Sequence, residues 1–224
     1  MKTIYPRSLA ATLDVVNDAY FYGKTIKKSQ REQIAQWIAS RQGLPGSYAR
    51  MFAPTAYDFK RGIRLFTGER MISGAAIGHI LGEEACRTLI LMKSSDSKVK
   101  DALQRATRGM MSFLNKPRRN IGHYCCGPCT GAYWRHLIVG GLDNNKRRLA
   151  AGVRLLKSCR DNEGSWRRFP FFYTLLALHE MDFPAARAEI DYAAPRCEKY
   201  LKYARKDGTY SNRRRMLAQR VLEL

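Results

Sequence analysis

Apolar residues recur with a helical period along nearly the whole chain. After Pro6, positions Leu9, Leu13 and Val16 lie on one helical face, and the pattern continues to Gly23. No alternating strand and no two-residue hairpin signal is evident, so the sequence predicts an all-α fold. Similar patterns predict helices over about 29–43, 55–66, 73–92, 96–114, 130–140, 145–159, 169–181, 184–205 (kinked or broken at Pro195) and 212–223.

Two helix starts carry a capping signature. Ser29 and Glu32 have the spacing of a capping box, in which side chain and backbone satisfy each other's hydrogen bonds. Thr55 and Asp58 form a weaker version of the same pattern. We therefore expect helices to begin at both places.

An internal repeat organises the helices. Residues 37–48 align without gaps on residues 155–166, and weaker copies occur at 131–133 and 207–210, with a degenerate one near 94–96. Each unit is predicted to be a helix, a Gly-small-aromatic turn and a second helix. Glycine takes a positive φ there, the hydroxyl residue caps the next helix, and the aromatic ring packs neighbouring units together. One hairpin cannot bury its apolar stripe, so the units are expected to stack.

The repeat resembles the α/α-toroid repeats of the terpenoid cyclase and protein prenyltransferase superfamily. The resemblance is carried by Leu155-Leu156, by Glu163-Gly164-Ser165-Trp166 and by residues 173–178. It implies one domain over residues 1–224, in which antiparallel α-hairpin repeats form a full or partial α/α toroid. About five hairpins are too few for a closed six-hairpin ring, which leaves room for completion by a second copy in a homodimer. A generic helical repeat bundle is the alternative.

The motifs that carry catalysis in that superfamily are missing. The sequence has no Asp-x-Asp-Asp run, no Asp-x-Cys and no Cys-Gly-Glu-Gln stretch. It also lacks a P-loop, His-Glu-x-x-His and Gly-x-Ser-x-Gly. The resemblance therefore implies a fold, while enzymatic activity stays open.

The chain's charge points to an anionic partner. Its 224 residues hold 40 Lys+Arg against 19 Asp+Glu, a net charge of +21, and residues 105–170 alone hold 14 basic and 3 acidic side chains. Arginine predominates among the basic residues, which favours bidentate contacts with phosphate or carboxylate. No apolar run is long enough to span a membrane, and no signal sequence is recognisable. We expect a cytoplasmic location with reduced cysteines.

The sharpest local motif is the cysteine cluster around Cys126-Gly127-Pro128-Cys129, which has the four residues of the thioredoxin redox motif and precedes a predicted helix. Cys126, Cys129 and His123 are the candidate catalytic residues. The same cluster predicts, as an alternative, a zinc site from Cys126 and Cys129, with Cys125 or His123 as the third ligand and Cys159 or His179 as the fourth. The interpretation that the sequence favours is thiols packed at a tight Gly-Pro turn, with no cofactor.

A second group of residues suggests a ligand cavity. Aromatic side chains near the clearest repeat turn are expected to line it, with arginines holding an anionic head group of a small or amphipathic ligand. The candidates are Tyr133, Trp134, Trp166, Arg167, Arg168, Phe172 and Tyr173. For any single aromatic residue, packing between helices is the favoured alternative.

Nucleic acid is the competing partner. Basic clusters at 118–119, 146–148, 167–168 and 213–215 lie near predicted loops or helix starts. If they converge on one face, they would bind a phosphate backbone without reading its sequence. No helix-turn-helix signature accompanies them.

Overall fold

The computed structural model describes residues 3–115, 121–204 and 207–224. It is 65% helical, which confirms a mainly helical fold. The helices are α1 (Leu9–Phe21), α2 (Lys28–Ala39), the 3-10 turn η1 (Tyr48–Arg50), α3 (Ala56–Arg61), α4 (Gly74–Met92), α5 (Ser97–Leu114), α6 (Gly127–Ile138), α7 (Asn145–Ser158), α8 (Phe171–His179), α9 (Pro184–Tyr203) and α10 (Thr209–Leu222). Strands β1 (Ile63–Arg64) and β2 (Arg70–Met71) form a short antiparallel hairpin.

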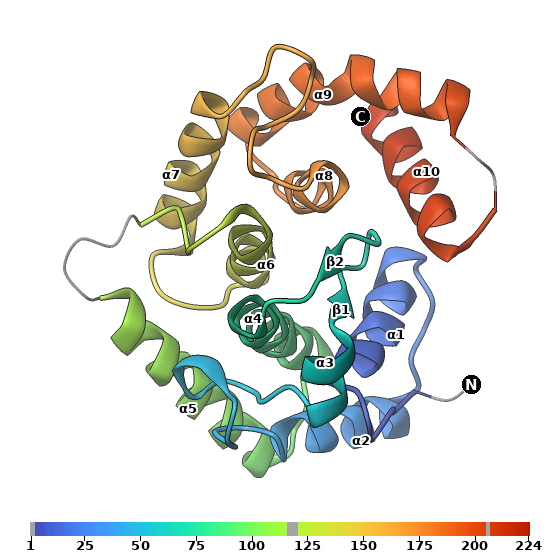
Figure 1. Cartoon of the computed structure of the whole chain (residues 1–224). Helices are drawn as coiled ribbons and strands as arrows, with labels where there is room; N and C mark the ends of the chain where they lie inside the picture. The colour runs from blue at the N-terminus through green and yellow to red at the C-terminus, as the bar shows by residue number, and fades with distance from the viewer. Residues whose placement is uncertain (1–2, 116–120, 205–206) are drawn as a thin grey trace.

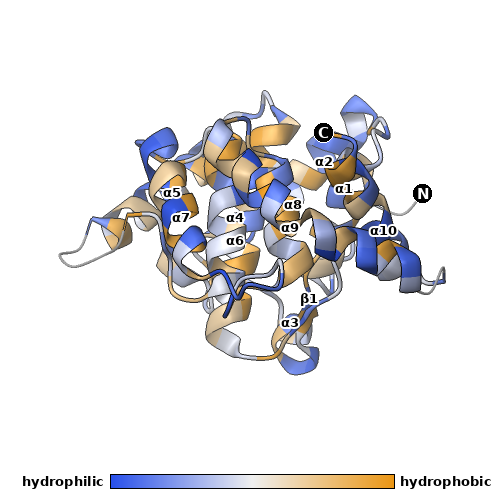
Figure 2. Cartoon of the chain, turned by 90° about the horizontal axis from the view of Figure 1, so that it is seen from above, coloured by the Kyte–Doolittle hydropathy of each residue, from blue (hydrophilic) through white to orange (hydrophobic). Residues whose placement is uncertain are grey.

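Helices α4, α6 and α8 occupy the interior and the remaining long helices surround them (Figure 1). Helix α6 packs between α4 and α8, while α5, α7 and α9 each pack against the inner helix that precedes them in the chain. One hydrophobic core runs through this arrangement, from Leu9 in α1 to Val221 in α10. The peripheral α10 is largely hydrophilic (Figure 2).

The three inner helices run in the same direction. At their N-terminal ends, His79 of α4 lies beside Cys125, and a Cβ atom added to Gly127 of α6 would be 2.1 Å from the carbonyl oxygen of Arg168, just before α8. At their C-terminal ends, Arg87 of α4 and Arg135 of α6 both bind Glu180, the residue that ends α8. Like ends of α4, α6 and α8 therefore meet.

Helix α4 is buried on all sides. Every residue from Ile77 to Leu89 is buried, which fits a helix enclosed by neighbours and excludes an amphipathic surface helix. Small residues permit this close packing, because a Cβ atom on Gly82 would lie 2.7 Å from Met51. The charged side chains in this stretch must consequently find partners inside the protein.

The first and last helices of the structure are tied together. The guanidinium of Arg213 in α10 binds Asp14 at 2.7 and 2.9 Å and Asp18 at 3.1 Å, both in α1. Arg213 is buried and its guanidinium lies 4.0 Å from the ring centre of Phe66. This contact joins the two ends of the helical arrangement.

One predicted cap is confirmed and the other is wrong. Thr55 and Asp58 form a capping box at α3, and Asp58 also accepts hydrogen bonds from Ser8 and Leu9 at the start of α1. Helix α2 begins at Lys28, before Ser29, and has no capping box. The Glu32 side chain instead accepts a hydrogen bond from Ser94, so a contact between distant segments replaces the local one.

Three further expectations differ from the structure. The helix expected to continue to residue 66 ends at Arg61, where Gly62 takes a φ of 71°, and residues 63–71 form the β1–β2 hairpin although no strand was expected. Helix α9 passes through Pro195 as one helix. The copy of the repeat at 131–133 lies inside α6 and is no turn.

The clearest repeat is present in the backbone conformation as well as in the sequence. Gly46 and Gly164 occupy equivalent positions and have φ values of 86° and 77°, as the repeat predicts. The hydroxyl residues beside them do not act as expected, because Ser47 makes no side-chain capping bond and the second turn is held by Asp161, which accepts from Glu163 and Ser165. Within the described residues, no helix is long and apolar enough to cross a membrane.

Candidate functional site

A cluster of buried charges lies where the C-terminal halves of α4, α6 and α8 meet α1. Arg135 donates to Glu84 and Glu180, and Arg87 donates to Glu180 at 2.9 Å. Asn17 of α1 accepts from both arginines and donates to Glu84 at 3.2 Å. We call Asn17, Glu84, Arg87, Arg135 and Glu180 the Arg–Glu network.

Opposite charges favour the ionised forms of Glu180 and Arg135. Burial raises the pKa of Glu180, but Arg135 and Arg87 outweigh this effect and the pKa is lowered overall. Burial likewise lowers the pKa of Arg135, and Glu180 and Glu84 reverse that and raise it well above its usual range. Tyr173 donates to Glu84 at 2.6 Å, and its pKa is raised by burial and by that carboxylate.

Burying four ionised groups is an expensive way to stabilise an interior. Well-packed apolar residues of similar size are often as stable as a buried ion pair or more so, because each ion loses its hydration. A buried charged network beside a cavity is therefore a candidate functional site. Here such a cavity adjoins the network.

The cavity has a volume of about 280 Å³ and combines arginines with aromatic rings. We call it the central pocket. Its lining residues are Asn17, Tyr20, Phe21, Phe66, Arg87, Arg135, Leu176, His179, Glu180 and Arg220. Three arginines against one glutamate make the lining positive. Its aromatic and leucine side chains offer apolar contact.

Several polar groups of the central pocket are not committed to protein partners. Among the described residues, Nε of Arg87 and Nδ1 of His179 have no hydrogen-bond partner. The guanidinium of Arg220 lies 4.4 Å from the ring centre of Phe21. Burial and the positive charge of Arg220 lower the pKa of His179, against the opposing effect of Glu180, so this imidazole is neutral near pH 7. Nε of Arg87 and Nδ1 of His179 are buried, so Arg220 is the group of this set that we expect a ligand in the pocket to contact.

The residues predicted to line a ligand cavity lie elsewhere. Tyr133, Trp134, Trp166 and Tyr173 are buried in the core. The indole of Trp134 donates to the carbonyl of Gly122, and that of Trp166 donates to Glu189, both at 2.9 Å. None of the seven candidates lines the central pocket. Packing between helices, the favoured alternative, describes these buried rings.

Part of the predicted aromatic group packs beneath a second, open groove of about 1070 Å³ along α9. The ring of Trp166 is 6.2 Å from that of Tyr192, and Phe172 is 4.6 Å from Tyr200. Both tyrosines line this groove together with Arg196, Lys199 and the 71% exposed Tyr203. Arg167 and Arg168 are exposed on the turn before α8.

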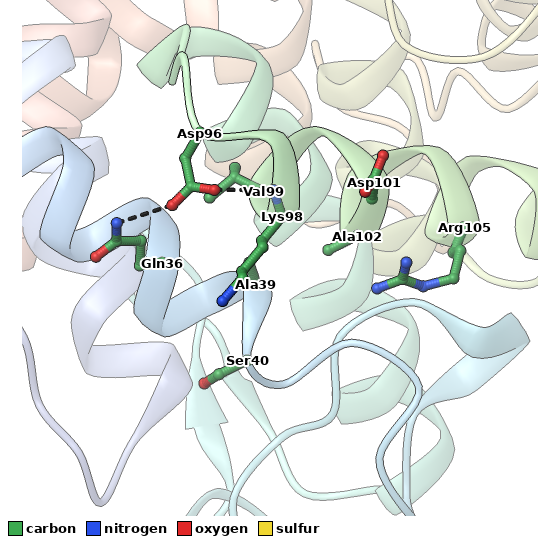
Figure 3. A pocket seen from close by; sticks show the side chains of 9 residues that line it. All are labelled: Gln36, Ala39, Ser40, Asp96, Lys98, Val99, Asp101, Ala102 and Arg105. Carbon is green, nitrogen blue, oxygen red and sulfur yellow. Dashed lines mark hydrogen bonds between the residues drawn. The ribbon is translucent and has the colours of Figure 1, made fainter.

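A third groove, of about 560 Å³, lies between α2 and α5 (Figure 3). Lys98 and Arg105 line it together with Asp96 and Asp101, so its charges are mixed. The carboxylate of Asp96 accepts from Gln36 at 2.8 Å and from the backbone N–H of Lys98, which caps α5. This groove thus contains a helix cap and offers no concentration of one charge.

Most of the basic clusters are only partly free. Arg148 pairs with Asp143 at 2.8 Å, Arg213 joins α10 to α1, and Arg214 donates to the carbonyl of Thr67 at 2.6 Å. Lys146 and Arg147 are exposed. Arg118 and Arg119 lie outside the described residues. The excess of arginine is therefore used in part for internal contacts.

The predicted cysteine cluster is brought together with a histidine that the sequence did not single out. Nδ1 of His79 is 3.2 Å from Sγ of Cys125, and the Sγ atoms of Cys125 and Cys126 are 3.9 Å apart. One donor atom each from His79, Cys125 and Cys129 lie within 4.8 Å of one another. We call these three residues and Cys126 the thiol–imidazole cluster; His123 does not belong to the trio.

The thiols of this cluster influence one another strongly. Hydrogen bonds from Cys125 and Cys129 lower the pKa of Cys126 to about 2, which makes it the thiolate of the group. Its hydrogen bond with Cys126 raises the pKa of Cys125 to about 11, and contacts with both other thiols raise the pKa of Cys129. All six cysteines of the chain are free thiols in this structure.

No family model matches the sequence, and no curated protein and no solved structure is found to match it. The sites themselves are therefore the basis for assigning a function. Sequence reasoning missed Arg87, Arg135 and Glu180, which come together from three helices. The sequence did contain a signal for the part of the network on α4, because charged residues interrupt a helical stretch that is otherwise apolar on every side.

Proposed function

We propose that this protein is an α/α-repeat domain of the toroid type that binds a small anionic or amphipathic ligand in the central pocket. The repeat-bearing sequence and the inner layer of three parallel helices, each followed by an outer helix, support the architecture (Figure 1). The contact of Arg213 with α1 supports a ring completed within the chain.

One observation supports the proposed class of ligand. Guanidinium groups and aromatic rings from separate helices converge on one cavity, next to a network of ionised groups that the core alone does not need. Arg220, whose guanidinium lies over the ring of Phe21, would supply donors for a carboxylate or phosphate group. Phe21, Phe66 and Leu176 would receive an apolar portion of the same ligand.

Thermal unfolding with inorganic phosphate, and with a short alkyl phosphate, tests this proposal. A ligand that binds only the folded state stabilises it by about 2.7 kcal/mol at one hundred times its dissociation constant. For a protein of this size we expect an increase in Tm of roughly 5–11 °C. The alkyl phosphate should bind more tightly than inorganic phosphate, because its chain buries apolar surface.

The matched variants are Arg220→Ala, at the central pocket, and Arg187→Ala, on exposed α9. Arg187 pairs with Asp191 at the surface and lies outside the pocket. Arg220→Ala should lose most of the ligand-induced rise in Tm, and Arg187→Ala should keep it. Equal responses of the two variants, or no response of the unmodified protein to either phosphate, would contradict the proposal.

A specific observation favours a second candidate, binding of single-stranded nucleic acid in the groove along α9. Tyr203 is exposed, and Arg196 and Lys199 lie with it in the same groove. Exposed aromatic rings stack on bases while cations contact the backbone.

Fluorescence anisotropy of a labelled single-stranded oligonucleotide tests this second candidate. The double variant Tyr203→Ala/Arg196→Ala should weaken oligonucleotide binding at least tenfold. The control Arg187→Ala, on the same helix, should not weaken it. Oligonucleotide binding that neither variant changes excludes this groove.

A further inference from the structure

The thiol–imidazole cluster gathers donors from segments far apart in the chain. His79 comes from the second turn of α4, whereas Cys126 is the N-cap of α6 and Cys129 lies in its first turn. His79 is nine-tenths buried, Cys129 is fully buried, and Cys125 and Cys126 face solvent. The cluster therefore has buried donors, from His79 and Cys129, on its inner side and accessible donors, from Cys125 and Cys126, on its outer side.

The distances within the cluster fit one small ion. Zinc bonds of 2.3 Å to sulfur and about 2.0–2.1 Å to nitrogen, at tetrahedral angles, place two sulfur ligands about 3.8 Å apart and a sulfur and a nitrogen about 3.6 Å apart. The sulfurs of Cys125 and Cys126 are 3.9 Å apart, and Nδ1 of His79 lies 3.2 Å from Cys125. Donor atoms of His79, Cys125 and Cys129 lie within 4.8 Å of one another, and the exposed Cys126 side chain would have to rotate to join them as the fourth ligand.

The chemistry of the donors selects the metal. Three thiols and one imidazole are soft and borderline ligands that suit zinc, whereas calcium and magnesium require oxygen. The donor trio contains no carboxylate. From the geometry and the donor set, we propose that His79, Cys125, Cys126 and Cys129 bind one Zn²⁺ ion.

The surroundings hold the ligands in place. The ring of Tyr48 lies 3.8 Å from that of His79 and the ring of Tyr124 lies 5.0 Å from it, which restricts the imidazole. The backbone N–H of Tyr124 donates to the hydroxyl of Thr130 at 3.1 Å, and this bond fixes the segment that carries Cys125 and Cys126. Contacts of this kind orient metal ligands in advance.

Four protein ligands make a closed site of the structural kind. The ion joins the N-terminal end of α4 to that of α6, and each cysteine that binds it loses its proton on binding. The site is separate from the central pocket, because His79 and Arg87 are eight residues apart on α4, a rise of about 12 Å. Zinc binding at the thiol–imidazole cluster can consequently be tested independently of ligand binding in the central pocket.

Metal analysis of the full chain, purified without a histidine tag and without chelators, tests the proposal. We expect about one zinc per chain, a lower Tm after removal of the metal by a chelator, and recovery of the Tm when Zn²⁺ is restored. Replacement by Co²⁺ should give sulfur-to-cobalt charge-transfer bands and the intense visible bands of tetrahedral cobalt. These spectra report thiolate ligation directly in the unmodified protein.

Matched variants identify the ligands. Cys129→Ser and His79→Gln should each weaken Co²⁺ binding at least tenfold, whereas Cys159→Ser and His123→Gln should bind as the unmodified protein does. His79→Gln alters a residue at the edge of the core and provides the comparison if Cys129→Ser does not fold. Cys159 is half-buried at the end of α7 and lies outside the cluster.

Four results would overturn the proposal. One is a folded protein that binds neither Zn²⁺ nor Co²⁺ when its thiols are reduced. Another is a cobalt spectrum without sulfur bands, or one that His79→Gln and Cys129→Ser leave unchanged. The third is stoichiometric copper or iron in place of zinc. A Cys126–Cys129 disulfide that persists in the isolated protein and prevents metal binding would also reject it, in favour of the redox interpretation of the motif.

Discussion

The two ends of the α4–α6 pair differ in their chemistry. At the N-terminal end, two exposed thiols gather with one buried thiol and a buried imidazole. At the C-terminal end, guanidinium and carboxylate groups are buried and matched in charge. Only a few helical turns separate the two.

The direction of the helices explains which group is found at which end. The N-terminus of a helix carries a partial positive charge and favours anions such as a thiolate, and its C-terminus favours cations. Cys126 is the N-cap of α6, while Arg135 lies in its last turn. Because α4, α6 and α8 are parallel, their dipoles add at each end. Parallel inner helices thus create one end suited to thiolates and one suited to arginines.

The largest expected effect comes from breaking the Arg–Glu network. Arg135→Ala removes the shared partner of Glu84 and Glu180, which leaves Glu84 with the neutral donors Asn17 and Tyr173 and Glu180 with Arg87. Loss of one partner of a buried ion pair destabilises a protein by about 3–5 kcal/mol. Urea denaturation should show this decrease, and Arg187→Ala should stay within about 0.5 kcal/mol of the unmodified protein. A decrease of less than about 1 kcal/mol would show that Arg135 contributes little to the C-terminal end.

A smaller decrease in stability is expected at the N-terminal end, where the starts of α6 and α8 meet. A Cβ atom on Gly127 would be 2.1 Å from the carbonyl oxygen of Arg168, so Gly127→Ala must separate the two helix starts. Overpacking of this kind reduces the free energy of unfolding by about 1–3 kcal/mol. Gly74→Ala is the control, because its nearest neighbour would be 3.9 Å away. Equal stability of the two variants would contradict the close contact of α6 with α8.

The smallest effect concerns acid. Arg135 and Arg87, acting against burial, lower the pKa of Glu180 in the folded state. A lowered pKa contributes stability that is present above the pKa of the unfolded chain, about 4.3, and is lost as the pH falls through the folded value. The free energy of unfolding should therefore decrease on acidification below about pH 4.5, and Glu180→Gln should decrease less steeply. Parallel curves from urea denaturation would show that another carboxyl group is responsible.

The sequence predicted most helices well, because their patterns are local. The segments expected at 73–92 and 96–114 are α4 and α5 within one residue. The β1–β2 hairpin was missed because two-residue strands are too short to show alternation. Helix α9 continues through Pro195, where the lost hydrogen bond falls on the carbonyl of Asp191, an exposed residue of an outer helix.

The candidate sites were predictable only where their residues are neighbours in the chain. Cys126 and Cys129 were recognisable from their spacing, but His79 lies 46 residues before Cys125 and joins it only in the folded protein. The Arg–Glu network was equally hard to predict, because Arg87 and Glu180 are 93 residues apart and meet only in the folded protein. Helical periodicity places these side chains on α4 and α8, and it contains no information about which helices become neighbours.

The contact between α10 and α1 has a consequence during protein synthesis. Arg213 is 199 residues from Asp14, so α1 is synthesised well before the residue that binds it. At 5–20 residues per second, α1 waits roughly 10–40 s for that partner. In the folded protein α1 also packs against α4, which is made much earlier than α10. The contact between α1 and α10 can therefore form only after the whole stretch between them has been synthesised.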